Sequence, residues 1–346
     1  MSNPPGVAKP TFEHHRWDTL VTGHTRPRIS WKFVRDSNTL PAWEQTAYEI
    51  EISTGEASTP VRFQFQSNES VLVPWPVGNL QSREKATARV RSCGTSNPAS
   101  GIHESWTAWS ESATIEAGLL SPDDWSAKWI VSTEKYAGDG PLQPLRFYKR
   151  FAVPAHQEPI SNARLYITSL GVFDAYINGS KASDEFMAPG WTSYNHRLAY
   201  RTLDVAPLLR SGGAPNSICI EVAEGWYAGR LAFNGGKRFC YGGDELAVLA
   251  QLEVHFGSNL ADPWTVATDE SWLCHLSGIQ SSEIYDGETY DMRKETDNWE
   301  SLILSADEKE FTPTNSFYCT FNAGQWPPHP IVGAYQKVPA QTTIAE

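Results

Sequence analysis

The chain has 346 residues, of which 40% are hydrophobic and 20% are charged, and its formal net charge is −12. This composition is typical of a folded globular protein, and the length suffices for two or more domains. The acidic balance repels phosphate backbones, and the sequence has no apolar run of 18 residues and no basic amphipathic stretch, so we expect neither a nucleic-acid partner nor a membrane partner.

The first residues and the cysteines bear on the cellular compartment. The first ten residues, MSNPPGVAKP, lack the apolar core of a secretory signal. The five cysteines are odd in number and widely spaced, and they contain no CxxC pair that would indicate a zinc site. Free thiols are typical of a reducing compartment, so we expect a cytoplasmic protein. Two Asn-X-Ser tripeptides, at Asn68 and Asn178, carry little weight without a secretory signal.

Alternating apolar and polar residues predict β-strands in the first third of the chain. Tyr48, Ile50 and Ile52 fall on one face of such a strand, and the glutamates between them fall on the other face. Residues 28–33 alternate in the same way, and clusters of turn-forming residues separate these runs at the spacing of a sandwich. The sequence therefore predicts an N-terminal arm over 1–19 and then a fibronectin- or immunoglobulin-like sandwich over 20–118.

A second all-β domain is predicted after a linker that contains a proline and two acids. Asn178-Gly179 follows an apolar run and is a strong hairpin signal, because both residues accept positive φ angles. Strands do not alternate with helices, so a jelly-roll β-sandwich over 119–294 is the natural architecture. The pattern degrades over 295–346, which is interpreted as the incomplete start of a further domain or as a tail. The expected jelly-roll strands include 146–151, 163–169, 173–177, 217–223, 246–254 and 264–268.

No complete catalytic site is evident in the sequence. It contains no HExxH, no GxSxG, no P-loop and no GxGxxG after a strand. A glycosidase needs two carboxylates that face each other across a cleft. The adjacent pairs Asp184-Glu185 and Asp244-Glu245 would point to opposite faces of a strand. We therefore expect this chain alone to be inactive as an enzyme.

Three stretches, 188–197, 224–230 and 283–293, are richer in aromatic and polar groups than a plain sandwich needs. Aromatic rings stack on the apolar faces of sugars, while amide and charged groups bind sugar hydroxyls. The first two stretches therefore predict a sugar-binding surface; the alternative is that they pack against a neighbouring domain with the tryptophans buried. The candidate sugar contacts are Trp191, Tyr194, Asn195, Trp226, Tyr227 and Arg230.

The third stretch gathers four acids, at positions 283, 286, 288 and 291. Their spacing differs from that of an EF-hand loop, so a calcium site there is one hypothesis and a solvated acidic loop is the other. We expect Asp286, Glu288, Asp291 and Arg293 to form an interdomain contact or the rim of a larger site.

Five motifs, in order along the chain, resemble the N-terminal domains of α-L-rhamnosidases of glycoside hydrolase family 78. Residues 26–31, Arg-Pro-Arg-Ile-Ser-Trp, resemble the fibronectin-like domain that precedes these domains in the family. The resemblance covers nearly all of 20–300, and Met292 stands where we would expect a small residue. The five motifs are 176–179 (Tyr-Ile-Asn-Gly), 188–192 (Ala-Pro-Gly-Trp-Thr), 200–205, 224–230 and 284–293.

The resemblance implies a role in the hydrolysis of terminal α-L-rhamnose. The family's inverting reaction uses an acidic general acid and a glutamate general base on a later (α/α)6 barrel, whose Asp-Cys-Pro-Gln-Arg motif does not occur here, so no catalytic residue is carried over. We interpret the chain as the N-terminal accessory part of an α-L-rhamnosidase, which docks against the missing catalytic barrel and holds a rhamnosylated glycan or glycoside, with calcium as a hypothetical bridge. The alternative is a stand-alone carbohydrate-binding or protein-interaction module; the missing motifs disfavour a complete small hydrolase.

Overall fold

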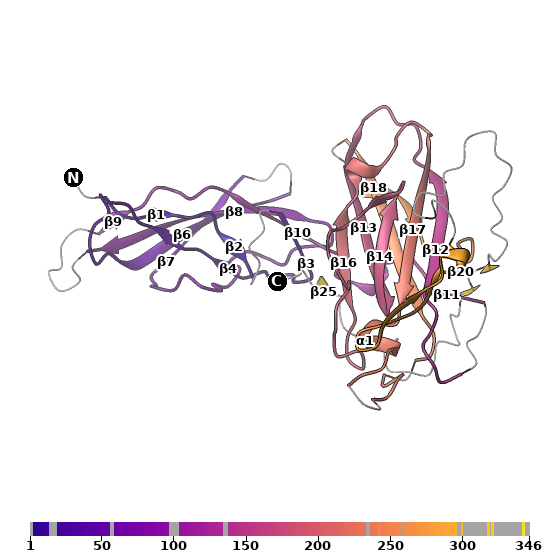
Figure 1. Ribbon diagram of the computed structural model, residues 1–346. Helices are drawn as coiled ribbons and strands as arrows, with labels where there is room; N and C mark the ends of the chain where they lie inside the picture. Colours follow the sequence, from indigo (N-terminus) through magenta and orange to yellow (C-terminus); the bar gives the residue numbers. More distant parts are fainter. Residues whose placement is uncertain are drawn as a thin grey trace. The chain divides into compact units, whose positions relative to one another are not determined.

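The computed structural model describes residues 3–13, 19–55, 59–96, 104–133, 138–232, 236–241, 243–257, 259–295 and 299, with the backbone of 317–318, 320–321 and 341–342. The chain divides into two compact units, the first reaching Leu120 and the second beginning at Ser121. Both units are built almost wholly of strands, which confirms the all-β prediction (Figure 1). Within the described part of the chain, no helix is long and apolar enough to cross a membrane.

The first unit is a β-sandwich whose main sheet has the strand order β3-β10-β8-β6-β7, with β9 added to β8. Ile50, Val90 and Ile115 come from three neighbouring strands and are fully buried, as the alternation predicts. Two short pairs, β1 with β5 and β2 with β4, complete the unit, so the described part of the predicted arm over 1–19 contributes strands and buries Phe12. The strands are β1 (Gly6–Val7), β2 (Thr11–Phe12), β3 (Thr19–Thr22), β4 (Ile29–Ser30), β5 (Phe33–Val34), β6 (Glu44–Thr54), β7 (Val61–Phe65), β8 (Lys85–Thr95), β9 (Ser105–Trp106) and β10 (Ala113–Ala117).

One face of the main sheet in the first unit carries a stack of arginines on a tryptophan. The guanidinium carbons of Arg62, Arg89 and Arg91 lie 5.1, 4.9 and 4.8 Å from the centre of the Trp109 ring. The two glutamates of β6 that alternate with buried residues accept hydrogen bonds from these arginines at 2.6 to 3.1 Å. Cation–π contacts contribute about 0.5–1 kcal/mol each at exposed sites. The Trp109 ring therefore stabilises the positions of all three arginine side chains.

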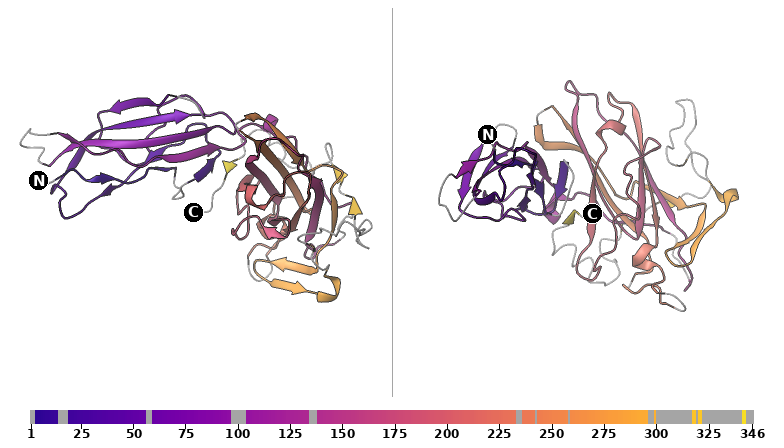
Figure 2. Two further views of the ribbon diagram at one scale, coloured as in Figure 1. Left: turned by 90° about the horizontal axis from the view of Figure 1, so that it is seen from above. Right: turned by 60° about the vertical axis from the view of Figure 1, so that its left-hand side comes forward.

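The second unit is a sandwich of two sheets around a separate hydrophobic core (Figures 1 and 2). The main strands from β11 to β20 alternate between the two sheets along the chain, which is the connectivity of a jelly roll, and the predicted fold class is thus confirmed. The sheets have the orders β24-β11-β18-β13-β16-β25, with β19 added to β18, and β15-β14-β17-β12-β20-β23. Leu165 and Leu252 from the first sheet and Phe147 and Ile220 from the second are fully buried between them.

The six strands expected in the second unit correspond to β12, β13, β14, β17, β18 and β19. The turn at Asn178-Gly179 has φ angles of +54° and +83°, which confirms the predicted hairpin between β14 and β15. The strands are β11 (Ile130–Val131), β12 (Leu145–Ala152), β13 (Ile160–Leu170), β14 (Val172–Ile177), β15 (Ser180–Lys181), β16 (Ala199–Asp204), β17 (Pro215–Ala223), β18 (Ala247–Phe256), β19 (Asn259–Ala267), β20 (Leu273–Leu276), β21 (Ile279–Glu283), β22 (Gly287–Tyr290), β23 (Phe317–Tyr318), β24 (Thr320–Phe321) and β25 (Gln341–Thr342). The helical turns are η2 (Pro122–Asp124), η3 (Ala206–Leu208), α1 (Gly225–Ala228) and η4 (Met292–Lys294).

The predicted linker and tail both have structure of their own. Ser121 caps the helical turn η2 in a capping box with Asp124, and Trp125 packs edge-on against Tyr166 and Tyr200 of the second unit. In the segment 295–346, the described backbone of β23, β24 and β25 pairs with β20, β11 and β16. These pairings place the three short strands in the sheets of the second unit, and most of the rest of that segment lies outside the described residues.

Replacing Trp109 with alanine should lower the free energy of unfolding of the first unit by about 1–3 kcal/mol, because three arginines lose their shared ring. Calorimetry, which resolves two unfolding transitions when two units melt separately, measures the change. Val71→Ala is the matched control, since Val71 is 70% exposed in the same unit and its truncation should leave the transition in place. An unchanged first transition in the Trp109 variant would show that the stack contributes nothing to stability.

Candidate functional site

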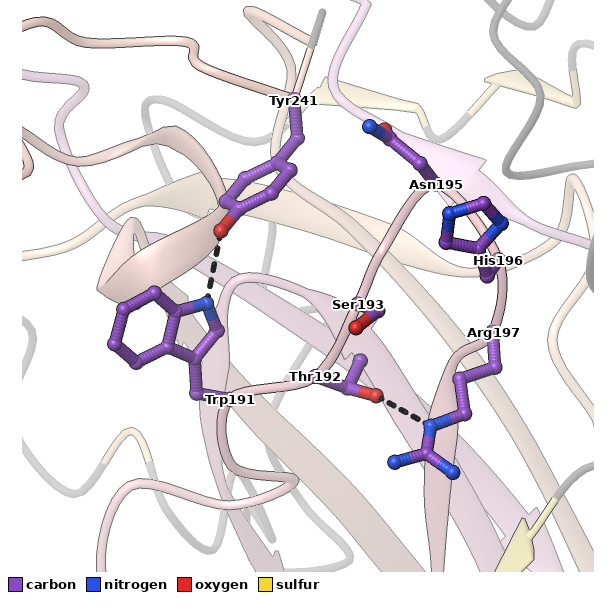
Figure 3. Close-up of a pocket in the computed structure, with 7 residues that line it drawn as sticks. All are labelled: Trp191, Thr192, Ser193, Asn195, His196, Arg197 and Tyr241. Carbon is purple, nitrogen blue, oxygen red and sulfur yellow. Dashed lines mark hydrogen bonds between the residues drawn. The ribbon is translucent and has the colours of Figure 1, made fainter.

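An aromatic platform is formed by Trp191 and by Trp226 of α1. This helical turn lies at one end of the second unit (Figure 1). The two rings are within 6° of parallel, and their centres are 6.0 Å apart. The indole Nε1 of Trp191 donates a hydrogen bond to the hydroxyl of Tyr241 at 3.0 Å (Figure 3). Trp191 is nevertheless 58% exposed, so its ring is held in place while one part of the platform stays open to solvent.

The backbone at Gly225 explains how Trp226 reaches the platform. Gly225 has a φ of +52°, and a Cβ atom there would lie 2.5 Å from Cγ1 of Val172. Only glycine tolerates both conditions, so the chain turns directly from the end of β17 into α1. Trp226 is then half-buried, while the neighbouring Tyr227 enters the core.

Two of the predicted sugar contacts, Tyr194 and Tyr227, lie beneath the platform. Both rings are buried, and they meet edge-on at 5.4 Å. Tyr194 also packs on Tyr241 at 4.8 Å, and its hydroxyl donates to the carbonyl of Gly190 at 3.3 Å. Burial raises the pKa of both phenols well above the usual range. The prediction of direct sugar contact is therefore corrected for these two residues, which support the loop from below.

A surface pocket of about 530 Å³ opens beside Trp191 (Figure 3). The side chain of Asn195 is exposed at this pocket, as a sugar-binding amide must be, and the Nε of Arg197 donates to the hydroxyl of Thr192 at 3.1 Å. The sequence analysis missed Tyr241, although the two glycines that follow it resemble the glycines beside the aromatic residues of 224–230. The pocket is lined by Trp191, Thr192, Ser193, Asn195, His196, Arg197 and Tyr241.

The third stretch forms a hairpin of β21 and β22, and Arg230 binds this hairpin and not the platform. The Nε of Arg230 donates to a carboxylate oxygen of Asp286 at 2.8 Å, and its guanidinium lies 5.7 Å from the ring of Tyr285. This hydrogen bond holds the pKa of Asp286 below its usual value. The side chain of Arg230 thus joins the second and third stretches, and contact between Arg230 and sugar stays a prediction.

A buried charge cluster of Glu224, Arg238 and Glu283 makes the second connection to the hairpin. Glu224 is fully buried and accepts hydrogen bonds from the backbone N–H of Leu142 at 3.0 Å and from Arg238 at 3.2 Å. The same nitrogen of Arg238 lies 2.5 Å from Glu283, whose side chain is 5% exposed. Burial raises the pKa of Glu224 to about 7. The sequence gives no signal for this cluster, because its partners are separated along the chain.

The predicted rim residues lie together on the hairpin and on η4, the turn that follows it. Asp291 caps η4 and pairs with Arg293, and the hydrogen bond from Arg293 lowers the pKa of Asp291 to about 2. Glu288 is exposed on β22. The hairpin lies outside the two stacked sheets (Figure 2). Tyr290 on its second strand is 46% exposed, and Met292 on η4 is 78% exposed.

The acids of the third stretch do not fit a calcium site. Glu283, Asp286 and Asp291 each pair with an arginine, and a calcium ion requires six to eight oxygen ligands directed at one point. Among the residues that the structure describes, no three histidine, cysteine or acidic side chains converge on a metal position. The acids instead neutralise arginines that hold the hairpin.

Stability should depend on pH through Glu224. The native carboxyl has a pKa of about 7 and its ordinary value is 4.5, so unfolding between these pH values releases a proton. The contribution of Glu224 to the free energy of unfolding should therefore be greatest below pH 4.5. It should fall by up to about 3 kcal/mol as the pH rises through 7. Glu224→Gln should abolish this decline in urea unfolding measured from pH 5 to 8.

Glu288→Gln is the control for this experiment, because Glu288 is an exposed glutamate of the same hairpin. It should reproduce the pH dependence of the unchanged protein. The same decline in the Glu224 variant would mean that another group is responsible.

Comparison with known proteins adds independent information. The model of the α-L-rhamnosidase N-terminal domain matches residues 158–327, and the model of the Rha78A-like N-terminal immunoglobulin domain matches residues 7–121. An α-L-rhamnosidase of Formosa agariphila is 33% identical over 313 residues, which are 85% of this chain and 31% of that protein. An α-L-rhamnosidase of Alteromonas sp. is 32% identical over 292 residues, 79% of this chain and 29% of that protein.

A solved structure shows the same arrangement of strands. The native α-L-rhamnosidase of Aspergillus terreus aligns with a TM-score of 0.77 and 41% identity, over 91% of this chain and 34% of that one. The chain thus spans about a third of the length of the relatives that it matches. Two domain models in the family's own order and these alignments agree with the resemblance found in the sequence, and the chain belongs to the α-L-rhamnosidases of glycoside hydrolase family 78, of which it carries the N-terminal domains.

Proposed function

We propose that this chain works as the accessory N-terminal part of a longer α-L-rhamnosidase, an enzyme that removes terminal α-L-rhamnose from glycosides. The observation that carries this proposal is the alignment of nearly the whole chain with about a third of each relative. The sequence also lacks any motif of a complete active site. Its contribution to such an enzyme would be binding and positioning, and the catalytic carboxylates would come from the remaining part.

The aromatic platform is the proposed contact for a rhamnosylated glycan. Trp191 offers a ring face that is 58% exposed and held by Tyr241, so little conformational entropy is lost when a sugar stacks on it. Asn195 lies in the adjoining pocket and supplies an amide for the hydroxyls. L-Rhamnose suits this combination because its methyl group and ring face are apolar and its hydroxyls are polar.

Trp191→Ala should weaken L-rhamnose binding by up to about tenfold, since a stacked aromatic ring contributes about 0.5–1.5 kcal/mol beyond its buried area. Isothermal titration of the chain with L-rhamnose, with and without calcium, measures this loss. The melting temperature should barely change, because the side chain is mostly exposed.

Two further variants make the titration decisive. Asn195→Ala should weaken binding without loss of stability. Tyr227→Ala should instead cost on the order of 3–5 kcal/mol of stability, because it removes a buried ring from the core. If the unchanged chain shows no heat of binding with L-rhamnose under either calcium condition, the sugar-binding proposal fails.

The hairpin of β21 and β22 is the proposed docking element for the catalytic part. A two-stranded hairpin is marginally stable alone, and this one is secured at its turn, where Arg230 binds Asp286 and Arg238 binds Glu283. Ile284 and Tyr290 of the hairpin are 38% and 46% exposed, and Met292 of the following turn η4 is 78% exposed. Exposed apolar side chains are frequent at interaction surfaces. The proposed partner is the remaining part of a longer polypeptide, because the relatives are about three times as long as the part that this chain matches.

Introducing charge at the hairpin should separate the two parts of the longer enzyme. The double variant Ile284→Asp, Met292→Asp should melt like the unchanged protein as the 346-residue chain, because both side chains are exposed. In an enzyme that carries this chain at its N-terminus, the same variant should lower the temperature of inactivation. Val71→Asp, in the first unit, is the control and should do neither. The docking proposal is contradicted if the unchanged enzyme, the double variant and the Val71 variant all inactivate at the same temperature. A native protein whose mass equals that of these 346 residues would contradict it too.

A further inference from the structure

Two tripeptides of this chain, Asn68-Glu69-Ser70 and Asn178-Gly179-Ser180, fit the acceptor pattern for N-linked glycans. Such tripeptides are frequent by chance, so the pattern alone does not select either of them. The structure gives the two asparagines opposite surroundings, and this difference decides which one can carry a glycan.

The side chain of Asn178 is part of the fold. Its Nδ2 donates hydrogen bonds at 2.8 Å both to the carbonyl of Leu208 and to Oδ1 of Asn216. Its Oδ1 accepts from the backbone N–H of Ser217 at 2.9 Å. A glycan on Nδ2 replaces one of these two hydrogens and needs the space that Leu208 and Asn216 occupy, so glycosylation at Asn178 is incompatible with this turn.

The side chain of Asn68 is exposed, and the described residues offer it no hydrogen-bond partner. The backbone on either side is nevertheless held in place. Nε2 of the buried Gln45 donates to the carbonyls of Ser67 and Glu69 at 3.1 and 2.8 Å, and the backbone N–H of Trp31 donates to the carbonyl of Ser70 at 2.9 Å. A glycan on Asn68 would therefore displace no contact of the folded chain.

We propose that Asn68 is the N-glycosylation site of this chain and that Asn178 is not. In the transfer, Nδ2 of Asn68 bonds to the anomeric carbon of an oligosaccharide carried on a lipid diphosphate. The bond from that carbon to the diphosphate oxygen breaks, the lipid diphosphate leaves, and the amide loses one proton. Transfer occurs on chains that enter a secretory compartment, so this proposal departs from the cytoplasmic expectation of the sequence analysis.

The position of Asn68 gives the glycan a physical role. Asn68 follows the end of β7 by three residues, and β7 is the last strand in the order of its sheet. Val61 and Phe65 of this strand are 50% and 36% exposed. An edge strand with exposed apolar side chains invites pairing with another molecule, and a bulky hydrophilic group beside it blocks that approach.

The test expresses the full chain behind a secretion leader in a eukaryotic host and measures the mass before and after treatment with peptide-N-glycosidase. One glycan is expected on the unchanged chain, and none on Asn68→Gln or Ser70→Ala. Ser180→Ala keeps Asn178 in its turn and removes only its tripeptide, so it should retain the glycan. Asn79→Gln alters an exposed asparagine outside any tripeptide and should retain it too.

Each remaining outcome overturns the proposal. These outcomes are an unglycosylated secreted chain, a glycan that persists in the Asn68 variant, and a glycan that is lost in Ser180→Ala. The shielding role is tested separately by light scattering during heating. Asn68→Gln should aggregate at a lower temperature than the glycosylated chain, and coincident aggregation curves would remove that role.

Discussion

The buried carboxylate of Glu224 joins three segments that lie far apart in the sequence. It accepts from the backbone at Leu142, it lies directly before the turn at Gly225 that positions Trp226, and it shares the guanidinium of Arg238 with Glu283 of the hairpin. Burying a charge is costly unless it is paired and hydrogen-bonded. Burial of this carboxylate is the main physical origin of the raised pKa of Glu224, and the second carboxylate on the same guanidinium, Glu283, raises it further.

The aromatic platform and the hairpin are therefore held by a common set of contacts. The loop that carries Arg238 also carries Tyr241, which fixes Trp191, and the backbone N–H of Phe239 in that loop donates to the carbonyl of Ala228 in α1. Arg230 extends the connection from α1 to Asp286. The three stretches that stand apart in the sequence thus form one continuous region of the second unit, which includes the aromatic platform and the hairpin.

The sequence was sufficient for features that depend on local periodicity. Tyr48, Ile50 and Ile52 are buried on one face as their alternation predicts, and Asn178-Gly179 forms the predicted turn. The sequence did not predict which aromatic side chains are buried and which are exposed, because the same residue types occur in the core and on the surface. Tyr194 and Tyr227 were indistinguishable from Trp191 in the sequence, and only their packing against each other separates them. Ion-pair partners were equally hidden, since Arg230 and Asp286 are 56 residues apart.

The contacts of Arg238 and Tyr241 have a thermodynamic consequence. A ligand that stacks on Trp191 also restrains Tyr241, and a domain that packs on the hairpin also restrains Glu283; both restraints act on the few residues around Arg238. Coupling free energies between two sites are reciprocal, so whatever sugar binding adds to the affinity of the hairpin for its partner, the partner adds to the affinity for sugar. A glycan held by this unit would then strengthen the assembly of the enzyme that acts on it.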